Sequence, residues 1–175
     1  MRRPIQLSRL DSPIGPLLLA VGEGELVGLD FDLSEEAAIA RLAQTHAGRT
    51  VEPARRGNKI VDRVKSYFAG RIHALDELPV APVGTPFQRK VWRALRRIPV
   101  GRTISYLELA TRVGNPAAMR AVGAANGKNP VALVVPCHRV IASDGNLHGY
   151  GGGLWRKEWL LRHEGALPQE LDLTA

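Results

Sequence analysis

The sequence lacks most of the features that would place the chain in a membrane or in an oxidising compartment. It has a single cysteine in 175 residues, which excludes an internal disulfide and a zinc site built from several cysteines. It has no run of about 18 apolar residues and no apolar stretch near the N-terminus long enough for a signal peptide. Repeats and low-complexity tracts are also missing. We therefore expect a cytoplasmic protein with a free thiol and no membrane partner.

Acidic residues are scarce in the second half of the chain. Residues 85–164 contain 13 lysines and arginines but only 4 aspartates and glutamates, whereas residues 1–84 contain 11 of each kind. The net charge of +7 therefore arises in one half. A one-sided basic domain favours a polyanionic partner, nucleic acid first, although an arginine-rich surface without such a partner is the alternative.

The first half predicts an antiparallel sheet with helices. Strands are expected at residues 5–10, 16–21 and 26–31, because each apolar run is bounded by a turn rich in glycine or proline. Ser34, followed by two glutamates, predicts the start of a helix, and residues 57–69 predict another. We find no catalytic constellation in this half and expect it to support the other.

Helix-capping residues indicate where the helices of the second half begin. Thr85 caps a helix that has proline at its first position and a glutamine that completes a capping box. Short helices at residues 105–113 and 116–126 indicate a helix-turn-helix, with an ordinary helical hairpin as the alternative. A buried strand is expected at residues 131–135, and a last helix at 154–163.

The expected organisation has four segments: a structural α/β domain over residues 1–78, a linker over 79–84, a C-terminal domain over 85–165 and a tail over 166–175. The fold class is α/β in the α+β sense. An antiparallel sheet with helices is followed by a mostly helical domain.

The second helix of the predicted pair is unusually smooth. It is rich in alanine and glycine and carries one long side chain, Arg120. Small residues let a helix approach another surface closely, and that surface is DNA in one interpretation and a neighbouring helix in the other. Helix packing does not explain a lone cation on such a face.

The one cysteine, Cys137, lies in the segment Pro136-Cys137-His138 between two apolar runs. A lone cysteine is more often a small buried hydrophobic residue than a nucleophile. A nucleophile needs a base and a group that orients the base, and His138 and Glu164 are the best candidates. Because adjacent side chains on an extended strand point to opposite faces, their cooperation requires a bend after Pro136 or a bridging water.

These segments resemble, in order, the O6-alkylguanine-DNA alkyltransferases, also called methylated-DNA–protein-cysteine methyltransferases. The resemblance covers about residues 85–165, and the opening meander resembles the family's N-terminal domain. The matching segments are Ser105-Tyr106, Arg120–Gly123 with Asn129-Pro130, Pro136–Val140, Tyr150 with its glycine-rich loop, Lys157–Leu161 and His163–Gly165. The resemblance implies a ribonuclease-H-like N-terminal domain and a winged helix-turn-helix-like C-terminal domain.

The resemblance also implies a DNA repair activity. The alkyl group of O6-alkylguanine, and by extension of O4-alkylthymine, would move irreversibly to Cys137 in a single turnover. The implied partner is double-stranded DNA with alkylated bases, bound in the minor groove with the target base flipped out. No cofactor and no metal is implied. We expect a monomer in solution, cytoplasmic and associated with the nucleoid when bound to DNA, and the sequence leaves cooperative binding on DNA open.

The family's site residues can be carried over by position. Cys137 would be the nucleophile and alkyl acceptor, and His138 the base, acting through a water while Glu164 orients it. Tyr106 would donate a proton to the leaving base, and Asn129 would link the helix pair to the cysteine segment, a structural role.

The remaining implied roles concern DNA and the flipped base. Arg120 would fill the space that the flipped nucleotide leaves in the stack. The other expected DNA contacts are Tyr106, Ala121, Gly123, Ala124, Lys128 and Arg139. The expected base pocket consists of Met119, Val135, Pro136, Tyr150, Gly151 and Gly152, and Gly151 stands where many relatives have Ser or Ala.

Two other functions stay open. A cysteine hydrolase or amidotransferase would use Cys137, His138 and Glu164, but it explains neither Arg120 nor the charge asymmetry. A non-catalytic DNA-binding module explains the charge but not the cysteine segment.

Overall fold

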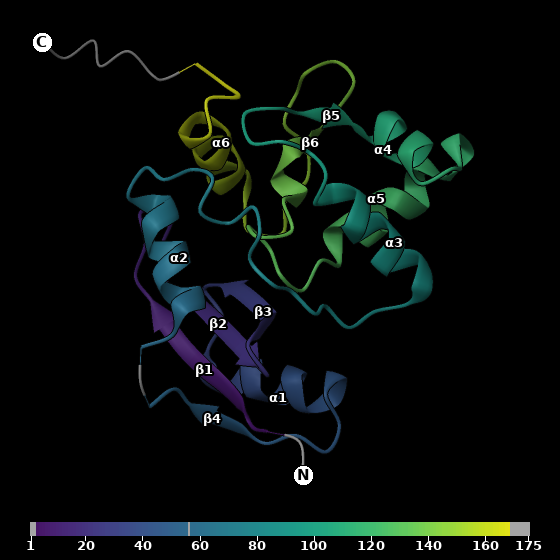
Figure 1. Ribbon diagram of the computed structural model, residues 1–175. Helices are drawn as coiled ribbons and strands as arrows, with labels where there is room; N and C mark the ends of the chain where they lie inside the picture. The colour runs from purple at the N-terminus through teal and green to yellow at the C-terminus, as the bar shows by residue number, and fades with distance from the viewer. Residues whose placement is uncertain (1–2, 56, 169–175) are drawn as a thin grey trace, which may run out of the picture.

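The computed structural model describes residues 3–55 and 57–168, which form a sheet-containing half and a mostly helical half (Figure 1). The sheet has the strand order β3-β2-β1-β4. Its strands are β1 (Ile5–Leu10), β2 (Leu17–Gly22), β3 (Glu25–Phe31) and β4 (Val51–Pro53). The antiparallel pairing of β1, β2 and β3 confirms the predicted meander. β4 pairs in parallel with β1 and was not predicted, since a three-residue strand shows no periodicity.

Strand β2, one of the two inner strands of the sheet, is buried on both faces. Because successive side chains point to opposite faces of a sheet, Leu17, Leu19 and Val21 enter one core while Leu18 and Ala20 enter another. The second core is small and lies between the sheet and one helix. The first core is the larger and continues into the other half of the protein.

Two helices flank the sheet, one on each face (Figure 1). Helix α1 (Glu35–Thr45) begins where predicted, at Ser34, whose hydroxyl accepts a hydrogen bond from the Ala37 N–H. Helix α2 (Lys59–Phe68) is capped by Asn58 and contributes Tyr67 to the large core.

The second half is mostly helical. Its elements are α3 (Pro86–Leu95), α4 (Tyr106–Arg112), the 3-10 turn η1 (Pro116–Ala118), α5 (Met119–Gly127), the 3-10 turn η2 (Cys137–Arg139) and α6 (Leu154–His163). The predicted capping box of Thr85 and Gln88 is present, and the two short helices α4 and α5 are confirmed. No helix in the described part of the chain has the length and apolar character needed to cross a bilayer.

A short pair of parallel strands joins two separate segments of this half. β5 (Ile104–Ser105) pairs with β6 (Val140–Ile141), so the start of α4 is held beside the segment that follows Cys137. Two-residue strands carry no recognisable pattern in the sequence. This pairing nevertheless determines where Tyr106, the first residue of α4, is placed.

The prediction of a buried strand at residues 131–135 is wrong. The segment is buried but turns, since the Val135 N–H donates to the Val131 carbonyl at 2.9 Å and Leu133 has a φ of +72°. Asn129 closes the turn: its Oδ1 accepts from the Val131 N–H, and its Nδ2 donates to the Val135 carbonyl at 2.7 Å. A side-chain amide thus satisfies backbone groups that a strand partner would otherwise bind.

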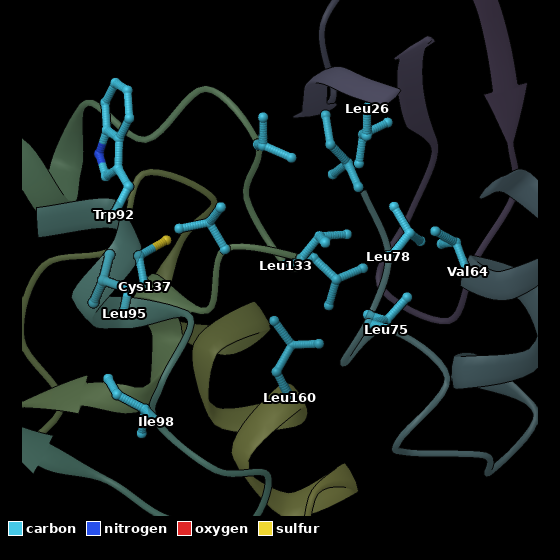
Figure 2. Close-up of a cluster of buried hydrophobic side chains, with 14 of the residues drawn as sticks. Leu26, Val64, Leu75, Leu78, Trp92, Leu95, Ile98, Leu133, Cys137 and Leu160 are labelled. Carbon is cyan, nitrogen blue, oxygen red and sulfur yellow. The ribbon is translucent and has the colours of Figure 1, made fainter. Parts of the chain in front are cut away.

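One hydrophobic cluster connects the two halves (Figure 2). It includes Leu26 and Val64 of the first half and Leu133 and Leu160 of the second. Residues 79–84 connect the halves and are bound to β3, because the Leu26 N–H donates to the Pro79 carbonyl and the Leu26 carbonyl accepts from Ala81. The halves are therefore packed against each other along an apolar surface.

Candidate active site

A cavity of about 830 Å³ lies between the two halves. Cys137, Tyr106 and Tyr150 line it from the second half, and Phe31 and Arg41 line it from β3 and α1. The first half therefore forms part of the site wall, which the sequence did not indicate.

Cys137 begins the 3-10 turn η2, so the chain bends directly after Pro136. Its sulfur accepts a hydrogen bond from Asn129 Nδ2 at 3.2 Å. Burial raises the pKa of the Cys137 thiol, and the Asn129 bond and the positive charge of Lys157 offset part of that rise. The thiol is therefore protonated near neutral pH, and its activation requires a base.

His138 is fully buried and lies against Glu164, with 3.0 Å between Nε2 and Oε1. Because a carboxylate oxygen can only accept here, Nε2 donates, and in the neutral imidazole this leaves the lone pair on Nδ1. Nδ1 is buried and has no hydrogen-bond partner among the described residues. The imidazole thus has the tautomer that a general base needs, with no direct hydrogen bond to the thiol.

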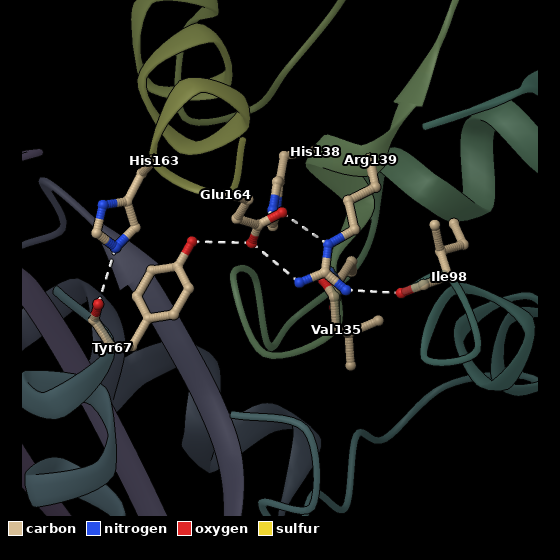
Figure 3. A network of polar contacts seen from close by, with 8 residues as sticks. Tyr67, Ile98, Val135, His138, Arg139, His163 and Glu164 are labelled. Carbon is tan, nitrogen blue, oxygen red and sulfur yellow. Dashed lines mark hydrogen bonds and ion pairs between the residues drawn. The ribbon is translucent and has the colours of Figure 1, made fainter. Parts of the chain in front are cut away.

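Glu164 accepts hydrogen bonds from three side chains (Figure 3). Arg139 donates through Nε to Oε2 and through a terminal nitrogen to Oε1, at 2.8 and 2.9 Å. The Tyr67 hydroxyl donates to Oε1 at 2.9 Å. Burial alone would raise the pKa of Glu164, but His138 and Arg139 outweigh it and hold that pKa well below its usual range.

The structure contradicts the predicted DNA contact of Arg139. This residue is only 6% exposed, and its guanidinium is bound to Glu164 and to the Ile98 carbonyl, the latter at 2.7 Å. The buried carboxylate needs a cation nearby, and Arg139 supplies it.

Tyr106 is half-buried in the cavity wall, next to its helix cap Ser105. Burial, followed by the charge of Cys137, raises the pKa of the Tyr106 phenol, which therefore stays protonated and can donate. An added Cβ at Gly123 would lie 3.8 Å from the Tyr106 ring. This glycine, predicted to contact DNA, packs against the tyrosine and also lines the cavity.

Of the residues assigned to the base pocket, Tyr150, Gly151 and Gly152 line the cavity, whereas Met119, Val135 and Pro136 do not. Met119 is 45% exposed on α5, and Val135 is fully buried with its carbonyl bound to Asn129. The exposed side chains of α5 and its end include Arg120, Ala121, Ala124 and Lys128. That surface is open to a partner.

Arg156 fastens the loop to the first half. Its Nε donates to the Ile14 carbonyl and a terminal nitrogen donates to the Gly152 carbonyl, both at 2.7 Å, and it also pairs with Asp32 at 2.5 Å. A Cβ on Gly152 would lie 2.7 Å from the Phe31 ring, so the loop backbone can approach that ring only as glycine. No local pattern in the sequence indicated this role of Arg156.

Lys157 was also missed as a site residue. It is fully buried, and its Nζ donates to the Val140 carbonyl at 2.6 Å and to the His148 carbonyl at 3.2 Å. Burial lowers the pKa of Lys157, whereas Cys137 raises it. A signal was available: Lys157 shares a helical spacing with Leu160 and Glu164, so all three lie on the buried face of α6 and its end.

Metal ligation has no support in the described residues, where no group of three or more His, Cys, Asp or Glu side chains could hold an ion.

Comparisons with known proteins agree with one another. A family model described as "6-O-methylguanine DNA methyltransferase, DNA binding domain" matches residues 86–166. The methylated-DNA–protein-cysteine methyltransferase of Salmonella typhimurium is 44% identical over 162 residues, covering 91% of this chain and 95% of the relative. The crystal structure of Mycobacterium tuberculosis O6-methylguanine methyltransferase is 42% identical, with a TM-score of 0.74 and 93% of each chain covered. A structure of OGT from the same organism in complex with DNA is also 42% identical, has a TM-score of 0.75 and covers 92% of this chain and 93% of that one.

Proposed function

This chain belongs to the family of methylated-DNA–protein-cysteine methyltransferases, and we propose that it repairs DNA by taking the alkyl group of O6-alkylguanine onto Cys137. The observation that carries this function is the position of the only cysteine. Cys137 lies in the wall of a cavity of about 830 Å³, and its sulfur accepts a hydrogen bond from Asn129. The next residue, His138, is buried and paired with Glu164. A cysteine that served only packing would need none of these polar neighbours.

The transfer is an in-line displacement at the alkyl carbon. The Cys137 sulfur forms a bond to that carbon while the bond from the carbon to O6 of guanine breaks, and the guanine leaves as an anion. The thiol proton passes through a water to Nδ1 of His138, which has a free lone pair. Glu164 stabilises the imidazolium that forms.

The leaving guanine acquires a proton from a neutral donor. Tyr106 has this role, because burial keeps its phenol protonated and both it and Cys137 line the cavity. The negative charge then passes to the Tyr106 phenolate, which regains a proton from solvent while the His138 imidazolium releases the thiol proton to solvent, so thiol and alkylguanine become thioether and neutral guanine.

The product is a thioether, which contains no bond that water hydrolyses readily. The chain has no second cysteine that could remove the alkyl group. Each molecule therefore acts once, and the reaction is stoichiometric.

Binding to DNA brings the alkylated nucleobase to the cavity. The target atom is inaccessible in a stacked duplex, so the nucleotide is flipped into the cavity. The small residues of α5 enter the minor groove, with Ala121, Ala124 and Lys128 on the exposed surface, and Arg120 takes the place of the flipped base in the stack.

Several finer assignments belong to the same proposal. The first half is a ribonuclease-H-like domain over residues 1–78, and residues 85–165 form a winged helix-turn-helix-like domain, joined by residues 79–84. The protein works as a cytoplasmic monomer on DNA and also accepts O4-alkylthymine. The tail expected over residues 166–175 lies outside the described residues from residue 169 onward.

Intact-mass measurement tests the function. Incubation with a duplex containing O6-methylguanine should add one methyl group per molecule, located on Cys137 by peptide mapping, and the Cys137→Ala variant should stay unmodified. Repaired DNA together with unmodified protein would contradict the transfer to Cys137. Repeated turnover of a p-nitrophenyl ester at this cysteine would favour a hydrolase instead.

A further inference from the structure

Among the described residues, Tyr67 alone forms a side-chain hydrogen bond from the sheet-containing half to the pair of His138 and Glu164 that serves Cys137. Its hydroxyl donates to Glu164 Oε1 across 97 positions of sequence. The same oxygen lies 3.0 Å from His138 Nε2 and accepts from Arg139 at 2.9 Å (Figure 3). One carboxylate oxygen therefore accepts hydrogen bonds from three donors, one of which belongs to α2.

The hydroxyl is held in place by its surroundings. Tyr67 is fully buried, and its own carbonyl accepts a hydrogen bond from His163 Nε2 at 2.8 Å. Its ring packs edge-on against Phe68 and His163, with centroids 5.2 and 4.9 Å apart. Burial, followed by the charge of Glu164, raises the pKa of Tyr67, so the phenol is a permanent donor.

We infer that Tyr67 is a positioning residue for alkyl transfer: it fixes the carboxylate of Glu164 and limits how strongly that carboxylate stabilises protonated His138. This inference rests on the proposed function, since it assigns a role in the same reaction. A hydrogen bond to a carboxylate withdraws charge from it and makes it a weaker partner for an imidazolium. The sheet-containing half thereby helps to set the pH range in which His138 is free to act as base.

Other charged and titratable groups near Glu164 do not replace this contact. Arg139 faces the carboxylate from η2, and His138 faces it from the same turn. Tyr150, in the glycine-rich loop, senses the charge of Glu164 but donates no hydrogen bond to that carboxylate among the described residues. Tyr67 is thus the neutral donor among these groups.

The Tyr67→Phe variant tests the inference. Without the hydroxyl, Glu164 holds protonated His138 more firmly, so the acid limb of the pH–rate profile for transfer from O6-benzylguanine should move up by about half to one pH unit. The rate should fall about 3- to 10-fold on the acid limb and recover to the wild-type value on the alkaline plateau. DNA affinity should not change.

Two further variants separate this role from packing. Phe68→Leu removes a ring that touches Tyr67 but leaves the hydroxyl, so its pH profile should match that of the wild type. In a Glu164→Gln background, adding Tyr67→Phe should cause no further shift, because Tyr67 acts through Glu164. A rate reduced by one factor at every pH, or an unshifted profile, would overturn the inference, whereas a wild-type protein that transfers no alkyl group would overturn the proposed function itself.

Discussion

The side-chain amide of Asn129 donates one hydrogen bond to the sulfur of Cys137, at 3.2 Å, and another to the carbonyl of Val135, at 2.7 Å. The family resemblance implied a structural role alone for Asn129. The contact with sulfur adds an electrostatic one, because a donor stabilises the thiolate relative to the thiol.

Replacing Asn129 with Ala should therefore affect both reactivity and stability. The pKa of Cys137 should rise further, so the midpoint for alkylation by iodoacetamide should move to higher pH. Loss of the partners of Val131 and Val135 should cost about 1–3 kcal/mol, measured by urea unfolding. Asn146→Ala, in an exposed turn, is the matched control and should change neither quantity. An unchanged alkylation midpoint in Asn129→Ala would refute the electrostatic role.

The lowered pKa of Glu164 predicts how the free energy of unfolding depends on pH. Because its folded pKa is held below the ordinary value of 4.5, its ionised form stabilises the folded state above about pH 4.5, and this stabilisation is lost as the pH falls toward the folded pKa. Glu164→Gln should be about 3–5 kcal/mol less stable at pH 7, with a difference from the wild type that shrinks below pH 4.5.

Guanidinium unfolding at a series of pH values measures this difference. Glu158→Gln is the control, since Glu158 pairs with Arg162 at the surface and should contribute no more than about 1 kcal/mol. A Glu164→Gln deficit that stays constant down to pH 3 would contradict the assignment.

Arg156 should stabilise both the fold and the glycine-rich loop. Arg156→Lys cannot reach the Ile14 and Gly152 carbonyls and Asp32 together, because an ammonium lacks the planar fork of a guanidinium. We expect a loss of about 2–3 kcal/mol in thermal or urea unfolding and slower transfer from O6-benzylguanine, as the loop at Gly152 loosens. Asp32→Asn keeps both carbonyl bonds and should cost less than about 1 kcal/mol. Equal effects in both variants would place the stabilisation in the ion pair alone.

A substitution at Arg120 should separate the binding of duplex DNA from alkyl transfer at Cys137. Arg120→Ala should slow repair of O6-methylguanine in duplex DNA by about tenfold or more, a difference of about 1.4 kcal/mol, while transfer from free O6-benzylguanine stays unchanged. Arg71→Ala, an exposed arginine of the other half, is the control. An equal loss on both substrates would refute the stack-filling role.

The elements that follow from local rules were predictable. Ser34 and Thr85 cap helices where expected, and the meander follows from alternating apolar runs and turns. The segment at residues 131–135 failed because an apolar run does not reveal that Asn129 binds its backbone in a turn. The predicted DNA contact of Arg139 failed for a related reason. Nothing in the local sequence shows that this cation, two residues after Cys137, is needed beside a buried carboxylate.

The sequence by itself determined the nucleophile and its family, because one cysteine in an ordered set of motifs is a local and specific pattern. It also determined the capped helices and the strands of the meander. Only the tertiary structure decided that Tyr67 and Arg139 converge on Glu164, and that Arg156 ties the glycine-rich loop to Asp32. These contacts join residues far apart in the chain, and they depend on how whole helices pack, which no short stretch of sequence encodes.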